Sequence, residues 1–380
     1  MFERPGPEIS GRGDVAILVS VDFGENDYEE SLQELRQLSI SAGLAVRGTI
    51  EGKRSAPDAK LFIGSGKADE LSQMMQASEA NIAVFNHDLS PSQQRNLERL
   101  LQARVVDRTG LILDIFSQRA QSHEGKLQVE LAQLAHLSTR LVRGWTHLER
   151  QKGGIGVRGG PGESQLELDR RMLRIRVKQL REKLIKLKAQ RGMQRRARQR
   201  SNVMTVSLVG YTNAGKSTLF NRLTKADSYV ADQLFATLDT TTHKIYVEGC
   251  GAIVLSDTVG FIKHLPHALV EAFSATLEEA VQADLLLHIV DTASTNRDEQ
   301  IAQVNKVLLE IGAANVPQIL VHNQIDRVGL APSISRDEYG RITTIHVSAK
   351  TGEGMDLLRL AMAEHSQHLQ KLSTEESTYV

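Results

Sequence analysis

The residues best suited to chemistry form one eight-residue stretch, GYTNAGKS at positions 210–217. It matches the phosphate-loop pattern G-x-x-x-x-G-K-[ST] and lies between an apolar run that favours a strand, MTVSLV, and a run that favours a helix, GKSTLFNRLT. Backbone N–H groups of such a loop and helix N-terminus cradle phosphates. We expect Lys216 to reach the β- and γ-phosphates and Ser217 to ligate Mg²⁺. The predicted phosphate-binding residues are Gly210, Tyr211, Thr212, Asn213, Ala214, Gly215, Lys216 and Ser217.

Two short motifs downstream complete a phosphate and metal site. FATLD at 235–239 places Thr237 as a second Mg²⁺ ligand, and DTVG at 257–260 follows an apolar strand-like run. Asp257 can hold Mg²⁺ through water, and the Gly260 N–H can sense the γ-phosphate. We therefore predict Lys216, Thr237 and Gly260 as catalytic, and Ser217 and Thr237 as metal ligands. Further residues predicted to line the site are Phe235, Ala236, Leu238, Asp239, Thr258 and Val259.

Two later motifs select the base. NQID at 323–326 ends another strand-like run, and Asp326 can accept two hydrogen bonds from the N1 and N2 edge of guanine, a donor pair that adenine lacks. Asn323 can bond N7 and brace the phosphate loop, and the Ala349 N–H can bond O6. The order and spacing of these motifs predict binding of GTP or GDP. The remaining predicted base-binding residues are Gln324, Ile325, Ser348 and Lys350.

Two positions depart from the usual GTPase pattern. Gln324 stands where GTPases usually have a lysine whose stem covers the base, so we expect weaker nucleotide affinity unless the glutamine packs equivalently. Phe261 stands where Ras-like enzymes have a glutamine that orients the attacking water. Phenylalanine cannot do this. Either another group orients the water, or hydrolysis is slow until a partner completes the site.

These motifs need a scaffold, and the chain divides into three regions that supply it. Residues 201–366 alternate apolar strand-like runs with helical patterns, which is typical of an open parallel sheet that binds ligands at the carboxyl ends of its strands. Residues 15–118 predict a smaller parallel α/β domain. We predict a multidomain α/β chain with a doubly wound, mostly parallel GTPase domain. A flexible start at 1–14 and a polar, frayed tail at 367–380 are expected to flank it.

Residues 119–200 have a different character. Apolar residues at helical spacing on both sides of GGIGVRGGPG, at 153–162, predict an antiparallel helical hairpin with a glycine-rich tip. The 380-residue chain has zero formal net charge, yet residues 163–200 contain fourteen Lys or Arg and four Asp or Glu, an excess of ten positive charges. Such a helix suits the phosphate backbone of RNA. The alternative is a solvated coiled-coil face whose tip is only a link.

Other features of the sequence indicate the cellular compartment and argue against two other glycine-containing stretches as nucleotide sites. The chain has a single cysteine, no secretory signal and no apolar run near the ~20 residues of a membrane helix, so we expect a cytoplasmic protein without a membrane partner. The glycines at 154–159 match G-x-G-x-x-G but do not follow a strand. The stretch at 63–70, IGSGKADE, lacks the first glycine and the hydroxyl of a phosphate loop.

From about residue 15 to 365 the chain resembles the HflX family, bacterial GTPases of the Obg–HflX branch. The block at 90–171 is the most diagnostic, because ordinary GTPases lack it. The chain departs from the common family pattern at Gln324 and at positions 239–241, where Asp-Thr-Thr replaces Asp-Pro-Thr. The stretches that carry the resemblance are FIGSGKADEL, FNHDLSPSQQRNLERLL, VVDRTGLILDIFSQRAQSHEGKLQVELAQL, GGIGVRGGPGESQLELDRR, GYTNAGKSTLFNRLT, LFATLDTTT and DTVGFIKHLPHALVEAF.

The resemblance implies a Mg²⁺-dependent GTP hydrolase, acting as a monomer. It implies binding to the large (50S) ribosomal subunit and its rRNA near the peptidyl transferase centre, stimulation by that subunit, and splitting or rescue of stalled or dormant ribosomes under stress. Two alternatives stay open: a non-catalytic RNA-binding module that senses GTP or GDP, suggested by Phe261 and Gln324, and a ribosome assembly factor. Some family members also hydrolyse ATP, but the sequence has no second phosphate-loop motif from which to derive that activity.

Overall fold

The computed structural model describes residues 13–24, 27–143, 161–199, 203–225, 234–263 and 274–378. These residues form two compact units; the first runs to Lys186 and the second begins at Leu187. Each unit is built on its own α/β sheet, which confirms the predicted fold class. Within the described ranges, no helix has both the length and the apolar character that crossing a bilayer requires.

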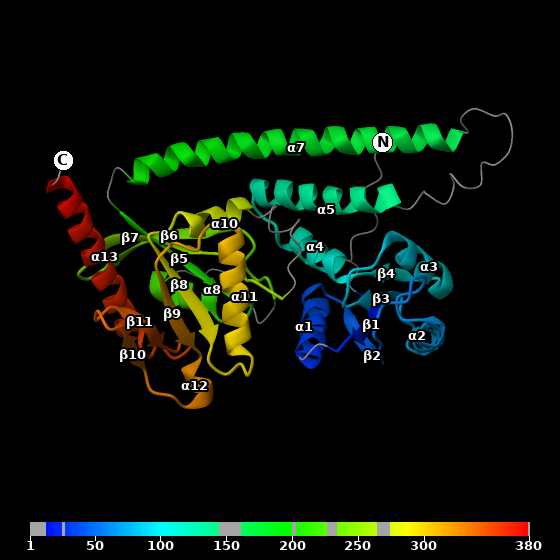
Figure 1. The fold of residues 1–380 in the computed structure, drawn as a ribbon, viewed down its shortest axis with the longest axis horizontal. Helices are drawn as coiled ribbons and strands as arrows, with labels where there is room; N and C mark the ends of the chain where they lie inside the picture. The colour runs from blue at the N-terminus through cyan, green and yellow to red at the C-terminus, as the bar shows by residue number, and fades with distance from the viewer. Residues whose placement is uncertain are drawn as a thin grey trace. The chain divides into compact units, whose positions relative to one another are not determined.

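The first unit contains a four-stranded sheet with the order β2-β1-β3-β4, in which all neighbouring strands are parallel. Helices α1 and α4 pack on one face and α2 and α3 on the other, so the apolar runs of β1 and β3 are buried (Figure 1). Helix α3 begins with Pro91, and Ser90 Oγ accepts from the Gln93 N–H at 3.2 Å. The elements are β1 (Val15–Asp22), α1 (Tyr28–Ser41), β2 (Ala45–Lys53), α2 (Ser65–Ala77), β3 (Ile82–Phe85), α3 (Pro91–Leu101), β4 (Arg104–Val106) and α4 (Arg108–Arg119).

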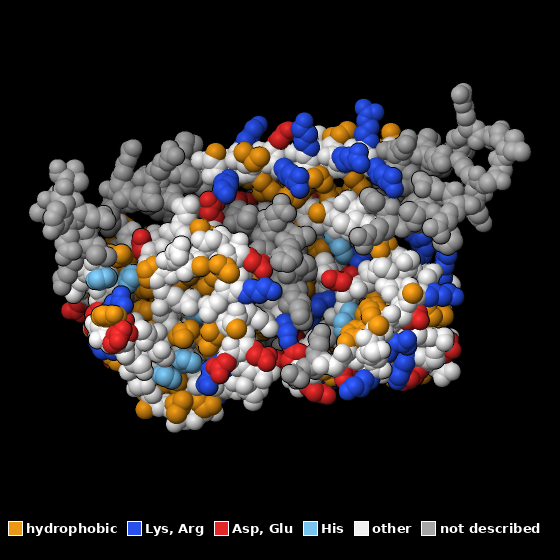
Figure 2. Space-filling model, viewed as in Figure 1, with side chains coloured by type: hydrophobic (Ala, Val, Ile, Leu, Met, Phe, Trp, Pro, Cys, Tyr) orange, Lys and Arg blue, Asp and Glu red, His pale blue; other side chains and the backbone are white. Residues whose placement is uncertain are grey.

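Two long helices follow, α5 (His123–Arg143) and α7 (Pro161–Gln199), and they run in opposite directions (Figure 1). The Arg176 guanidinium on α7 pairs with Glu130 on α5 at 2.6 Å. Leu180 is fully buried, whereas Lys and Arg side chains stand out along α7 (Figure 2). Residues 153–160 of the predicted glycine-rich tip lie outside the described residues. The last two residues of the tip, Pro161 and Gly162, are the first residues of α7. The exposed cationic residues of α7 include Arg171, Arg174, Arg176, Lys178, Arg181, Lys183, Lys186 and Lys188.

The second unit contains a seven-stranded sheet with the order β10-β11-β9-β8-β5-β7-β6. Helices α8 and α13 pack their apolar residues against one face of the central strands, and α10 and α11 cover the other face (Figure 1). The carboxyl ends of β5, β7, β8, β9 and β11 therefore share one edge, where ligands bind in such sheets. The elements are β5 (Met204–Gly210), α8 (Lys216–Thr224), β6 (Thr241–Val247), β7 (Gly251–Asp257), α10 (Ser274–Val281), β8 (Leu285–Asp291), α11 (Arg297–Glu310), β9 (Gln318–Asn323), α12 (Ile325–Val328), β10 (Ser333–Arg336), β11 (Ile342–His346) and α13 (Met355–Thr378).

Two details of the second unit differ from the sequence-based expectation. The outermost strands, β6 and β10, are antiparallel to their neighbours and were not predicted, because their mostly exposed residues make no apolar run. The expected frayed tail at 367–380 is wrong for residues 367–378, which continue α13 to Thr378. The segment contains no glycine or proline that would end a helix, and Leu369 packs against the core. The helix therefore continues past position 366.

Candidate nucleotide-binding site

The phosphate loop joins β5 to α8 and is braced by the predicted base-binding segment. Gly215 precedes the helix with a φ of +92°, and a Cβ at this position would collide with Asn323 Nδ2, so only glycine fits. The same Nδ2 donates to the Ala214 carbonyl at 2.9 Å. Asn323 thus braces the loop as the sequence predicted, and it couples the phosphate end of the site to the guanine end.

Lys216 is the best-buried cation of the site. Its Nζ donates to the Gly210 carbonyl at 3.1 Å and to the Tyr211 carbonyl at 2.7 Å, and only 6% of the residue is exposed. Burial lowers the pKa of Lys216 to about 8, although the nearby Asp257 carboxylate opposes this shift. The two carbonyls hold the ammonium inside the loop, where phosphate oxygens are stronger partners for it.

Phe261 closes the loop through its backbone. Its N–H donates to the Gly210 carbonyl at 3.1 Å and its carbonyl accepts from the Thr212 N–H at 2.7 Å, which makes a parallel bridge beside the strand end. The phenyl ring is 1% exposed and lies in the core. The position after D-x-x-G is therefore a clamp on the phosphate loop, and its side chain cannot reach a water at the γ-phosphate.

Gly260, one residue earlier, needs to be glycine. A Cβ there would lie 2.8 Å from Thr212 Cγ2, 2.9 Å from Thr212 Cα and 3.0 Å from Lys216 Nζ. Contacts of this length with a backbone atom are too close for any side chain. The predicted γ-phosphate sensor is thus pressed against the phosphate loop.

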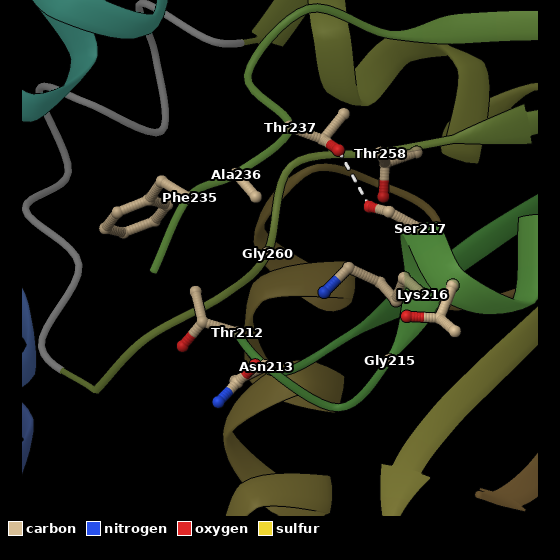
Figure 3. A pocket seen from close by; sticks show the side chains of 11 residues that line it. Thr212, Asn213, Gly215, Lys216, Ser217, Phe235, Ala236, Thr237, Thr258 and Gly260 are labelled. Atoms are coloured by element: carbon tan, nitrogen blue, oxygen red, sulfur yellow. Dashed lines mark hydrogen bonds between the residues drawn. The ribbon is translucent and has the colours of Figure 1, made fainter. Parts of the chain in front are cut away.

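These residues line a cavity of about 50 Å³ that is open to solvent. Figure 3 shows Lys216 and Ser217 rising from the loop, with Phe235, Ala236 and Thr237 on the opposite wall. Thr212 Oγ1 is buried and has no hydrogen-bond partner among the described residues, which suits a phosphate oxygen. The lining residues are Thr212, Asn213, Gly215, Lys216, Ser217, Thr218, Phe235, Ala236, Thr237, Thr258 and Gly260.

Three oxygens converge where the sequence predicted a metal. Ser217 Oγ lies 2.8 Å from Thr237 Oγ1 and 2.7 Å from Asp257 Oδ2, and Thr237 Oγ1 lies 3.0 Å from the same Oδ2. In the octahedral shell that Mg²⁺ prefers, neighbouring ligands at about 2.1 Å from the ion lie about 3 Å apart. Burial raises the pKa of Asp257, and the two hydroxyls oppose that shift. The residues present therefore fit Mg²⁺, with Ser217 and Thr237 as ligands and Asp257 beside them.

The guanine end is more exposed and is held by side chains. Asp326 is exposed, and its Oδ1 accepts from Ser348 Oγ at 2.6 Å, which orients the carboxylate. The Ala349 N–H, expected on guanine O6, donates to Asn323 Oδ1 at 2.9 Å. The predicted O6 donor is therefore bonded to Asn323 in this structure and must exchange that bond for guanine O6. Guanine N7 is an acceptor, so its predicted bond comes from Asn323 Nδ2, which is not part of that bond.

Gln324, the neutral residue in place of the usual lysine, bonds both to the phosphate loop and to Arg327. It has a φ of +65°, and its Nε2 donates to the Asn213 carbonyl of the phosphate loop at 3.2 Å. Its Oε1 accepts from Arg327 Nη1 at 2.6 Å. The sequence allowed two interpretations of Gln324: weaker nucleotide affinity, or packing equivalent to that of the usual lysine. The contact of Gln324 with the phosphate loop is what equivalent packing requires. The effect on nucleotide affinity stays a prediction.

The structure gathers the predicted residues into two adjoining groups at the carboxyl edge of the second sheet. Leu238, Val259 and Ile325 are buried, so any contact of theirs with a nucleotide comes from the main chain. The residues predicted at the phosphate end are Gly210, Tyr211, Thr212, Asn213, Ala214, Gly215, Lys216, Ser217, Phe235, Ala236, Thr237, Leu238, Asp239, Asp257, Thr258, Val259 and Gly260. The residues predicted at the guanine end are Asn323, Gln324, Ile325, Asp326, Ser348, Ala349 and Lys350.

Sequence reasoning missed residues that support this arrangement. Arg222 on α8 donates from Nε to the Ala349 carbonyl at 3.1 Å and from Nη2 to the Lys350 carbonyl. Arg327 and Thr218 were also missed. Arg222 lies 127 residues from Ala349 in the chain, and no motif spacing marks such a contact. Thr218 could have been included as the residue that follows the phosphate-loop serine.

Comparisons with known proteins agree with this geometry. Three family models match consecutive parts of the chain: GTP-binding GTPase N-terminal at residues 29–117, GTP-binding GTPase Middle Region at 119–198, and 50S ribosome-binding GTPase at 205–324. GTPase HflX from Escherichia coli K12 is 54% identical over 370 residues, covering 96% of this chain and 87% of the relative. GTPase HflX from Magnetococcus marinus is 50% identical over 329 residues, covering 86% and 76%.

Solved structures support the fold. The crystal structure of a GTP-binding protein from the hyperthermophilic archaeon Sulfolobus solfataricus in complex with GDP aligns with a TM-score of 0.50 and 23% identity, over 94% of this chain and 100% of that one. The crystal structure of an SsGBP–GDP complex aligns with a TM-score of 0.51 and 24% identity. The fold, the assembled phosphate and guanine motifs and the 54% identity across 96% of the chain lead to one conclusion: this protein belongs to the HflX family of GTPases, which bind guanine nucleotides and hydrolyse GTP.

Proposed function

We propose that this GTPase binds the large (50S) ribosomal subunit, that the subunit stimulates its GTP hydrolysis, and that the cycle splits or rescues stalled or dormant ribosomes under stress. The observation that carries the proposal is the buried Phe261 ring. Among the described residues lining the cavity there is no Gln, Glu, His or Arg to orient the attacking water, which favours a partner that completes the site. The 50S ribosome-binding family model at 205–324 supports this choice of partner.

In the proposed mechanism each residue has one task. Lys216 leaves the loop carbonyls and binds the β- and γ-phosphate oxygens, and the Gly260 N–H contacts the γ-phosphate. Ser217 and Thr237 would hold Mg²⁺, which would supply positive charge against the developing negative charge. In-line attack by water on the γ-phosphorus yields GDP and phosphate. The loss of the γ-phosphate then releases the two walls of the cavity.

The cationic face of α7 is the proposed RNA contact. Eight described Lys and Arg side chains of this helix are exposed, and three of them pair with a carboxylate: Arg176 with Glu130, Lys178 with Glu182 and Lys188 with Glu278. Such cations bind rRNA by releasing counterions, which makes binding steeply salt-dependent. We infer a division of work in which residues 201–366 turn over GTP, while residues 119–200, with the glycine tip, contact rRNA near the peptidyl transferase centre. We propose that the protein acts as a monomer in the cytoplasm.

The test is GTP turnover with and without purified large subunits, titrated against salt. We expect low turnover alone and stimulation of at least tenfold that declines as salt rises. Turnover that stays at background with saturating subunits would favour the non-catalytic nucleotide-sensing module. Strong stimulation by immature subunits but not mature ones would favour the assembly factor. Sedimentation of joined ribosomes with protein and GTP tests splitting, because the joined particle disappears if splitting occurs.

A charge-reversal variant separates RNA contact from catalysis. Arg174→Glu combined with Arg181→Glu should abolish stimulation by large subunits and leave GDP affinity and basal turnover unchanged, because both side chains are exposed on α7, outside the nucleotide site. Lys306→Glu with Lys244→Glu is the matched control, since these exposed residues lie on α11 and β6. Equal loss of stimulation in both double variants would show a general charge effect and contradict a contact through α7.

A further inference from the structure

A chain of hydrogen bonds connects an exposed arginine to the phosphate loop. Arg327 Nη1 donates to Gln324 Oε1 at 2.6 Å, and Gln324 Nε2 donates to the Asn213 carbonyl at 3.2 Å. Asp291, at the end of β8, anchors the outer end, with its Oδ2 3.3 Å from the same Nη1. The other Asp291 oxygen, Oδ1, accepts from the Ala293 N–H at 2.8 Å, so the carboxylate is held in place.

We propose that Arg327 is a positioning residue for the guanine nucleotide, and that the Arg327–Gln324–Asn213 relay takes the role that a single lysine has in the usual guanine motif. The proposal deepens the function of the nucleotide site and rests on guanine-nucleotide binding. It does not depend on the ribosome. It also answers why Gln324 can stand in this position without leaving the phosphate loop unsupported.

Arg327 helps to hold the Gln324 amide in one orientation. A guanidinium only donates hydrogen bonds and a carbonyl only accepts them, so the amide satisfies both neighbours in one orientation alone. With Arg327 in place, Oε1 accepts from the guanidinium and Nε2 donates to the Asn213 carbonyl. Without Arg327, Nε2 can still donate to that carbonyl, but the side chain loses the bond that holds its outer end, so its support of the loop weakens.

The backbone at both inner members of the relay is arranged for this contact. Gln324 has a φ of +65° and Asn213 a φ of +63°, and each is a non-glycine residue in the left-handed region. The left-handed turn at Gln324 follows directly on the end of β9, and the one at Asn213 lies within the phosphate loop. Asparagine adopts this region readily, whereas glutamine does so at a cost, so the contact between the two turns stabilises the turn at Gln324 in particular.

Arg327 also supplies a positive charge beside the guanine motif at 323–326. Replacing the usual lysine with Gln324 removes one positive charge, and Arg327 supplies one three residues later, on α12. The bond from a charged donor to the amide oxygen is stronger than a bond between two neutral groups. Because 58% of the Arg327 side chain is exposed and Asp291 offsets part of its charge, the effect on affinity is moderate.

The relay supports the phosphate loop and touches no group that reads the purine edge. Asp326, whose Oδ1 accepts from Ser348 Oγ, carries that selection. Loss of Arg327 should therefore weaken GDP and IDP by the same factor, although IDP lacks the 2-amino group. An arginine acting on the base itself would change the ratio of the two affinities.

The experiment measures equilibrium affinities for GDP and IDP by fluorescence, with the full chain and no ribosomes. Arg327→Ala should weaken both nucleotides about fivefold, the size expected for an exposed charge-assisted bond. Arg327→Lys, which keeps a donor, should recover at least half of the loss in binding free energy. Arg336→Ala is the matched control, because Arg336 is also an exposed arginine, paired with Glu364 away from the site; it should leave both affinities within twofold.

The decisive comparison uses Gln324→Lys as background. A lysine at position 324 reaches the phosphate loop directly. In that variant, adding Arg327→Ala should therefore change the affinity for GDP less than twofold. In the native chain, with Gln324 present, Arg327→Ala should weaken GDP about fivefold. Equal losses in both backgrounds, no loss beside glutamine, or a shift in the GDP to IDP ratio would each overturn the relay. Thermal unfolding of all variants confirms that they are folded. Stimulation by ribosomes is measured separately, so its absence bears only on the proposed function.

Discussion

The two ends of the nucleotide site are built in different ways. At the phosphate end the main chain makes most of the contacts: Phe261 and the phosphate loop exchange backbone hydrogen bonds, and Lys216 is buried among carbonyls. At the guanine end exposed side chains such as Asp326 and Arg327 hold one another. Main-chain hydrogen bonds do not depend on the side chain that a residue carries, so Phe261 can make its contacts at the phosphate end in place of the usual glutamine. At the guanine end the usual lysine is replaced by Gln324, and other side chains complete its contacts.

The largest expected effect tests the buried end. Lys216→Ala removes the only described cation lining the cavity, so GTP turnover with large subunits should fall at least 100-fold. Single-turnover assays of phosphate release measure it. Lys225→Ala, at the exposed end of the same helix, is the control and should keep near-native turnover. A Lys216→Ala protein with more than a tenth of native turnover would remove the basis for the contrast.

A change at the exposed end should alter selectivity more than turnover. Asp326→Asn turns one acceptor of the carboxylate into a donor, so the preference for GTP over XTP should fall by about 10- to 100-fold. Competition binding with the two nucleotides gives the ratio. The variant should fold normally because Asp326 is exposed. An unchanged ratio would mean that the base is read elsewhere.

A third effect concerns stability beneath the phosphate end. Burial lowers the pKa of His288 to about 4, with smaller effects from Lys216 and His322. The unfolded chain takes up this proton near pH 6.5, so stability should fall as the pH drops from 6.5 toward 4, by at most about 1.4 kcal/mol per pH unit from this group. Urea unfolding at pH 7, 6 and 5 measures the slope. His288→Phe should flatten it; an identical slope in that variant would rule His288 out.

The smallest expected effect is at the junction of the two ends. Arg222→Ala removes the bonds from α8 to the carbonyls of Ala349 and Lys350, so GDP affinity should fall about three- to fivefold. Dissociation rates of labelled GDP resolve such a change. Arg359→Ala, exposed on α13, serves as control. If dissociation from Arg222→Ala matches the native rate, the loop at 348–350 holds its place without this brace.

What the sequence could predict depended on how local the signal was. The phosphate loop, DTVG and NQID are short strings that end strands, so their residues could be named in advance and lie where a parallel sheet brings them together. The contacts of Arg222 and Arg327 depend on tertiary packing. The antiparallel edge strands β6 and β10 lack an apolar run, and Leu369 extends α13 because it packs on a core that no local pattern reveals.

The bonds that Lys216 and Ser217 make within the protein have a kinetic consequence. If these bonds must break before a nucleotide is captured, this opening becomes a first-order step that precedes capture. The observed association rate should then level off as GTP concentration rises, at a plateau equal to the opening rate, instead of climbing linearly. Stopped-flow mixing over a hundredfold range of GTP distinguishes the two curves.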